Sequence, residues 1–232
     1  MRCDRPRAYR HQPSKHDEAG HSGENVPRDR GDRGAQCGGQ TTWCRRHAGT
    51  GLVPEYTPTG TEPDEADLRS QADYWVAVNS RRWARALAVE AATGRAICDS
   101  DPLKLHYSWC LSMIGAAPRA RWEHDYAATR TAFAAGLLGL ADAVFVSIPP
   151  LEVLRQHKDA DPTRRRRHFD LHARLGDSLR QWYTTVDRLD PGRGIWNLPP
   201  DGIPRRLPPA RKNRTQVDLL DALVTSLPRL PT

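Results

Sequence analysis

The feature that most constrains the fold is a continuous apolar run in the middle of the chain, AVFVSI at residues 143–148. Such a run is typical of a strand covered on both faces, because a strand with one face in water alternates apolar and polar residues. Two shorter apolar runs, LV at 52–53 and AIC at 96–98, each lead toward acidic residues. We therefore expect short buried strands at all three places.

Helical patterns separate these strands. Between residues 68 and 94 apolar side chains recur at helical intervals, and Gly94 is expected to end that helix. Further helices are predicted from Pro102 to Gly115, over 119–140, over 151–189 and over 215–227, with an edge strand over 195–198. This alternation predicts an α/β fold, a three-layer sandwich around a mostly parallel sheet. The apolar face expected on the helix over residues 68–94 consists of Leu68, Ala72, Trp75, Val76, Trp83, Leu87 and Ala88. The side chains of Trp109, Trp122 and Trp182 are also expected in the core.

Acidic residues follow two of the predicted strands, at the sheet edge where ligands of such folds bind. Glu55 follows residues 52–53, and Asp99 and Asp101 follow residues 96–98. Phosphoryl transfer uses a carboxylate near the acceptor hydroxyl, a carboxylate that holds Mg²⁺, and cations over the phosphoryl group. The alternatives are an ordinary loop acid at Glu55 and a helix N-cap at Asp99 or Asp101, of which Asp101 is the better placed.

The segment GAQCGGQTT at residues 34–42 matches the phosphate-loop pattern G-x-x-x-x-G-K-[ST] except at one position. Gly34 and Gly39 occupy the glycine positions, Thr41 the hydroxyl position, and Gln40 stands where the pattern has lysine. Residues 1–33 are rich in Arg, Gly, His and Asp and show no apolar periodicity, so we expect them to be disordered.

In chain order, GAQCGGQTT, VPEYT, AICDSDPLKLHYSWCL and the segment from AVFVSIPP to the arginine run resemble the P-loop nucleoside and nucleotide kinase superfamily. The resemblance is strongest to its thymidylate-kinase-like and deoxynucleoside-kinase-like members, and it covers residues 34–200. It implies ATP and Mg²⁺ as cofactors. It also implies transfer to a small hydroxyl or phosphate acceptor, in the first place a nucleoside or nucleotide.

The resemblance also implies roles for individual residues. Residues 34–42 would bind the phosphates through backbone N–H groups, and Thr41 and Asp99 would hold Mg²⁺. Glu55 would be the base toward the acceptor hydroxyl or an anchor for the substrate. The residues implied for phosphate binding are Gly34, Gly39, Gln40, Thr41 and Thr42, and those implied for a lid over the phosphates are Arg155, Arg164 and Arg167.

The chain departs from this family in several ways, among them the bulky Trp43 in the first turn after the loop and the short helix before Gly49. Gln40 removes the loop lysine, which normally follows the transferred phosphoryl group as a point charge. No apolar strand precedes the loop, although the first strand of the family lies at the centre of its sheet. Two interpretations remain open: a degenerate relative with impaired transfer, or a stretch before Gly51 that is not the authentic start of such a domain, for example after a reading-frame error.

The net charge of +7 favours an anionic partner and leaves a second function class open, a non-catalytic protein that binds nucleic acid or another partner. Its basis is the run Arg164–Arg167 and the segment IPRRLPPARKNR at 203–214. These runs contain no interleaved aromatic residues, so this class ranks second. A charge run is also often only a solvated face.

The remaining expectations concern organisation and location. The 5 cysteines lack CxxC spacing, so neither zinc nor a disulfide framework is indicated. No apolar run approaches the roughly 20 residues that span a bilayer, and we expect a cytoplasmic protein without membrane contact. We divide the chain into residues 1–33, a kinase-like domain at 34–200, a Pro/Arg-rich linker at 201–214, and a helix with a tail at 215–232. The oligomeric state stays open.

Overall fold

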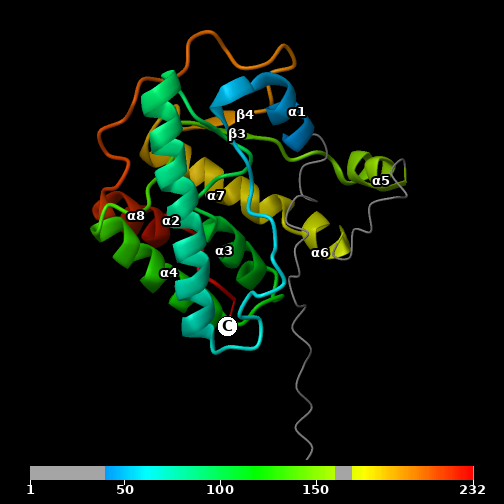
Figure 1. Ribbon diagram of the computed structural model, residues 1–232. Coiled ribbons are helices and arrows are strands. Elements are labelled where there is room, and N and C mark those ends of the chain that lie inside the picture. Colours follow the sequence, from blue (N-terminus) through cyan, green and yellow to red (C-terminus); the bar gives the residue numbers. More distant parts are fainter. Residues whose placement is uncertain (1–39, 160–168, 232) are drawn as a thin grey trace, which may run out of the picture.

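The computed structural model describes residues 40–159 and 169–231. Helices surround the short strands of the described chain, with α2 running along the front of the molecule and α4 and α8 beside it (Figure 1). The elements in chain order are α1 (Gln40–His47), the 3₁₀ turn η2 (Gly49–Gly51), β1 (Leu52–Val53), α2 (Leu68–Thr93), β2 (Ile97–Cys98), α3 (Leu105–Met113), α4 (Arg119–Ala134), β3 (Val144–Val146), α5 (Leu151–Asp159), α6 (Phe169–Ala173), α7 (Gly176–Leu189), β4 (Gly194–Trp196) and α8 (Val217–Ser226).

The strands form two parallel pairs. β1 pairs with β2, with Leu52 opposite Ile97, and β3 pairs with β4, with Val144 opposite Gly194. Within residues 40–159 and 169–231 these are two separate two-stranded sheets. The prediction of a mixed α/β fold with parallel strands is therefore confirmed. A single sheet in a three-layer sandwich stays a prediction.

The core lies among α2, α3, α4, α7 and α8. Trp182 of α7 is fully buried, and its ring lies 6.0 Å from that of Trp109 and 6.3 Å from that of Trp122. Leu220 and Leu223 of α8 close the cluster. The prediction that tryptophans form the core is confirmed for Trp83, Trp109, Trp122 and Trp182, whereas Trp75 is only partly buried.

Helix α2 begins and ends where the sequence predicts. Its N-cap Asp67 accepts a hydrogen bond from the N–H of Ser70, and Gly94 at its C-cap has the left-handed φ of 81°. The predicted apolar face is wrong at its C-terminal end, because Leu87 and Ala88 are exposed. Leu87 borders a cavity instead of packed core, so no neighbouring side chain covers it.

Helix α3 begins later than predicted, at Leu105, and Pro102 lies in the turn before it. The Oδ1 atom of Asp101 accepts a hydrogen bond from the N–H of Leu103 inside this turn, and Lys104 holds the N-cap position. The interpretation of Asp101 as a helix N-cap is therefore wrong: its carboxylate satisfies a turn, and the left-handed φ of Lys104 separates that turn from the helix.

The predicted helix over 151–189 contains three described helices, α5, α6 and α7, and residues 160–168 lie outside the described part. The predicted strands at 143–148 and 195–198 are shorter in the structure, as β3 and β4. None of the described helices has the length and apolar character needed to cross a lipid bilayer.

Candidate functional site

A cavity of about 520 Å³ lies between the two strand pairs. At the carboxyl ends of the strands it is bordered by Thr41, Glu55, Asp99 and Lys104. At their amino ends it is bordered by Glu90, Asp142 and Arg214. Charged groups thus gather at the two ends of the cavity, and residues of β2 and β3 form apolar walls between them.

Helix α1 brings a hydroxyl to the strand-end carboxylate. The Oγ1 atom of Thr41 donates to Oδ1 of Asp99 at 3.3 Å. The helix is held there because Nε1 of Trp43 donates to the carbonyl of Pro199 at 2.7 Å and because the side chain of Cys44, also on α1, is buried. Burial raises the pKa of Asp99, and the hydrogen bond from Thr41 opposes this rise. Thr41 therefore helps Asp99 keep its charge.

Glu55 lies at the end of the neighbouring strand and is paired with a cation. The Nζ atom of Lys104 is 2.5 Å from Oε1 of Glu55, and the Ser100 hydroxyl donates to the same oxygen at 3.2 Å. Burial opposes ionisation of Glu55, but the charge and hydrogen bond of Lys104, with Arg82 and Ser100, outweigh it. The pKa of Glu55 therefore lies below its ordinary value, and the carboxylate is ionised at neutral pH.

Arg82 of α2 forms hydrogen bonds with the backbone after both β1 and β2. Its Nε donates to the carbonyl of Pro54 at 3.2 Å, and its Nη2 donates to the carbonyls of Asp99 and Ser100 at 3.1 and 3.2 Å. The Arg82 residue is 8% exposed, so water screens its charge little from the nearby carboxylates of Glu55 and Asp99. Within the described residues its Nη1 has no hydrogen-bond partner.

The backbone after β2 holds two residues in the left-handed region. Ser100 has a φ of 81° and Lys104 a φ of 47°, and neither is glycine. Such conformations cost about 1–3 kcal/mol each and persist only where surrounding contacts fix them. Here the contacts of Arg82 with Ser100 and of Glu55 with Lys104 fix both residues beside the cavity.

A second polar chain lies deeper in the same end of the cavity. The hydroxyl of Tyr183 donates to Oδ2 of Asp101 at 3.3 Å and lies 3.5 Å from Nδ1 of His106. Burial and the charge of Lys104 lower the pKa of His106 to about 3, so this imidazole is neutral at pH 7. Burial raises the pKa of Asp101. Asp101, His106 and Tyr183 thus form a polar part of the cavity wall near Lys104.

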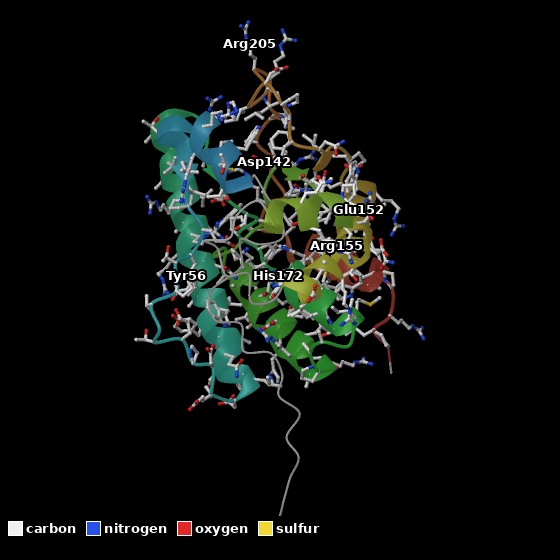
Figure 2. The ribbon with its side chains drawn as sticks, turned by 90° about the vertical axis from the view of Figure 1, so that its right-hand side faces the viewer. Tyr56, Asp142, Glu152, Arg155, His172 and Arg205 are labelled. Atoms are coloured by element: carbon white, nitrogen blue, oxygen red, sulfur yellow. The ribbon has the colours of Figure 1, made fainter. Side chains whose placement is uncertain are left out.

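The amino end of the cavity is closed by an arginine between two acids. Arg214 forms two hydrogen bonds with Glu90, at 2.7 and 2.8 Å, and its Nε donates to Oδ1 of Asp142 at 2.9 Å. Arg211 pairs with Asp190 and donates its backbone N–H to Asp142. Two of the arginines in the segment 203–214 are thus neutralised within the fold, whereas Arg205 projects away from the body (Figure 2).

The structure brings three of the predicted site residues together, namely Thr41, Glu55 and Asp99. Gln40 is the first residue of α1, and Thr42 is exposed on its outer side. Arg155 lies exposed on α5 (Figure 2) and does not border the cavity as far as the described chain shows. Gly34, Gly39, Arg164 and Arg167 lie outside the described residues.

Three charged residues of the cavity region were not singled out from the sequence. Arg82 lies four residues after Val78 and four before Ala86, so the helical spacing could have placed it on the buried face, where an arginine requires partners. Lys104 and Arg214 come from separate turns, and only the fold places them beside their carboxylates. The sequence spacing contains no signal for either contact.

The donor set suits Mg²⁺ that arrives with a phosphate ligand. No group of three or more His, Cys, Asp or Glu side chains that could hold a metal ion occurs among the described residues. Thr41 and Asp99 offer two oxygen ligands, and Mg²⁺ commonly takes one or two protein ligands and completes its shell with phosphates and water. The pair therefore fits a Mg²⁺ that arrives with a phosphate ligand better than a resident metal.

Comparison with known proteins gives no further guidance, because no family model, no curated protein and no solved structure matches this chain.

The ion pair of Lys104 and Glu55 makes a pH-dependent prediction. In Lys104→Met, burial is expected to raise the pKa of Glu55 above the ordinary 4.5. In the wild type, the ionised Glu55 carboxylate stabilises the fold above pH 4.5, and this contribution is lost as the pH falls. In the variant, the free energy of unfolding decreases as the pH rises, because ionised Glu55 is then buried without its cation. The difference in unfolding free energy should therefore grow from about pH 4 to pH 7. Urea titrations measure it.

The exposed Lys212→Met variant is the control for this measurement, and its difference from wild type should not change with pH. A constant difference for Lys104→Met as well would show that Lys104 does not determine the charge of Glu55.

Proposed function

We propose that this protein transfers a phosphoryl group from ATP to a small hydroxyl or phosphate acceptor, with a nucleoside or nucleotide as the leading acceptor class. The observation that carries the proposal is the contact between Thr41, in the first turn of α1, and Asp99 at the end of β2. A hydroxyl and a carboxylate joined at a helix N-terminus suit a phosphate bound with Mg²⁺.

Each residue at this end has a distinct task. The first turn of α1 offers backbone N–H groups and the positive end of the helix dipole to phosphate oxygens. Thr41 and Asp99 would hold Mg²⁺, which when bound would neutralise charge on the phosphates. Glu55, ionised beside Asp99, would accept a hydrogen bond from the acceptor hydroxyl.

Lys104 supplies a cation at the same end, where Gln40 leaves the loop without one. The Arg82 guanidinium holds the ends of β1 and β2, and thereby Glu55 and Asp99, at a fixed separation. Such fixed charges lower the reorganisation needed when negative charge develops on the phosphoryl group.

The proposed α/β sandwich is consistent with this assignment, because both parallel pairs present their carboxyl ends to α1. Thr41 contacts the residue after β2, and Trp43 contacts the segment after β4. Binding of nucleic acid is the less favoured function, since Arg211 and Arg214 are neutralised by acids of the same chain.

The test uses the full-length protein. Isothermal titration with ATP and Mg²⁺ is expected to give a Kd in the micromolar to millimolar range, and γ-labelled ATP should label a nucleoside or nucleoside monophosphate from a panel. Gln40→Lys should raise the transfer rate by roughly tenfold, because a charge-assisted hydrogen bond to phosphate replaces a neutral one. Gln40→Met is the matched control of similar length and should not raise it.

Absence of both ATP binding and transfer in the wild type and in Gln40→Lys would overturn the proposed function. A salt-sensitive shift of labelled RNA or DNA with no response to ATP would favour the nucleic-acid class instead.

A further inference from the structure

The cavity between the strand pairs is bordered on one side by β2 and on the other by β3. Its walls include residues 96–100 at β2 and 141–148 at β3, whereas the described residues of β1 and β4 do not border it. β2 and β3 therefore both turn an edge toward the cavity. A two-stranded sheet is marginal by itself, and parallel sheets are ordinarily larger and covered on both faces.

The hydrogen bonds of the pairs show which backbone groups point into this space. The N–H of Asp99 donates to Val53, and the N–H of Val144 donates to Arg193. Because successive residues of a strand direct their backbone groups to opposite sides, Cys98 on β2 and its counterparts on β3 turn theirs away from these partners. The β3 counterparts are Ala143 and Phe145.

The two facing strands also run in the same direction. Arg214 joins Glu90, which precedes β2, to Asp142, which precedes β3, so the amino ends of both strands lie at one end of the cavity. Helix α1 lies at the other end, where Thr41 contacts Asp99 and Trp43 contacts Phe145 at 6.1 Å between rings. A strand parallel to both would complete a five-stranded sheet.

The walls select an apolar strand. Ile97, Val144 and Val146 border the space from the strands, Trp83 and Ala86 from α2, and Leu179 from α7. Placing charged side chains there would cost several kcal/mol each unless they found partners. The sequence of residues 1–39 is rich in Arg, Asp, His and Gly and contains no apolar run of the kind that these walls select.

We propose that the space between β2 and β3 is an acceptor slot for an apolar, extended segment of another polypeptide, about five residues long and parallel to both strands. Its backbone would pair with Cys98 on one side and with Ala143 and Phe145 on the other, as in strand-addition complexes. Alternate side chains would lie against α2 on one face and α7 on the other. This goes beyond the proposed phosphoryl transfer, which concerns the carboxyl end alone.

The test is a synthetic peptide with a five-residue core of valine and isoleucine, flanked by lysine and glycine for solubility and carrying a fluorophore. It is titrated with the full-length protein in the absence of ATP and Mg²⁺. Binding should protect the amides of Cys98, Ala143 and Phe145 from hydrogen exchange by at least tenfold. A peptide with the same side chains but N-methylated at alternate core residues should bind at least tenfold more weakly, because it lacks the donors.

A protein variant provides the reciprocal test. Ala143→Pro removes one N–H that faces the slot, at the residue before β3, where proline is compatible with a strand. It should weaken peptide binding about threefold to tenfold, the contribution of one hydrogen bond, and leave the thermal midpoint without peptide nearly unchanged. If this variant fails to fold, the comparison of the two peptides still decides.

Three results would overturn the slot: equal binding of the N-methylated peptide, binding without protection of these amides, and no binding. Protection that appears without peptide and rises with protein concentration would show that a second copy fills the space, which also contradicts the proposal. Because the peptide titration contains no ATP, a negative result there does not bear on the proposed phosphoryl transfer. A negative ATP titration likewise does not bear on the peptide slot.

Discussion

Asp99→Asn is expected to lower the rate of phosphoryl transfer by about 100- to 1000-fold, the size of effect seen when a fixed charge-stabilising group is removed from an active site. The amide keeps an oxygen that can accept the hydrogen bond from Thr41, so the placement of α1 should survive. What is lost is the negative charge that would hold Mg²⁺. Initial rates with γ-labelled ATP at saturating Mg²⁺ measure the effect.

The stability of the same variant should move in the opposite direction. Burial raises the pKa of Asp99, so its ionised form at pH 7 is less stable in the folded protein than in water. Replacing it with a neutral amide should therefore keep or raise the thermal midpoint. Asp73→Asn, at an exposed position of α2, is the control and should change neither quantity. Retention of transfer within threefold in Asp99→Asn would remove Asp99 from the proposed site.

Trp182→Ala is expected to lower the free energy of unfolding by about 3–5 kcal/mol, the cost of deleting a large aromatic side chain from a packed core. The side chain is fully buried and contacts the rings of His106, Trp109 and Trp122. It joins α7 to α3 and α4 at one point. Urea denaturation followed by circular dichroism measures the loss.

Two further variants show whether the loss in unfolding free energy depends on the burial of the tryptophan or on its residue type. Trp182→Phe should cost less, because the ring is largely kept and the indole N–H, which has no partner among the described residues, is removed. Trp196→Ala on β4 should cost under about 1 kcal/mol, because that ring is 37% exposed and its described contact is the Arg180 guanidinium at 5.6 Å. A loss for Trp182→Ala no larger than for Trp196→Ala would contradict the core described above.

The helices and strands could largely be predicted from the sequence, because their signals are local. Gly94 ends α2 and the apolar run at 143–148 contains β3, since a left-handed cap and a buried strand each leave a pattern in a few residues. The start of α3 could not, because Lys104 adopts the left-handed conformation and pairs with Glu55, far away in the sequence, and neither feature leaves a local pattern.

The candidate site shows the same division. Glu55 and Asp99 could be singled out because they follow strands, and the structure places them beside Thr41. Arg82 and Arg214 act across the fold, and their partners are fixed by tertiary packing rather than by spacing. Arg155, a basic residue after a strand, is exposed on α5, and its role in a lid stays a prediction.

The contacts of Arg214 have a consequence for how the chain can come apart. This arginine lies just before α8, and it bonds to Glu90 at the end of α2 and to Asp142 before β3. α8 itself places Leu220 and Leu223 in the central core. Loss of this final segment would leave two acids without their counterion and would open the core at the same time. The C-terminal segment therefore unfolds together with α2 and β3 as one cooperative unit.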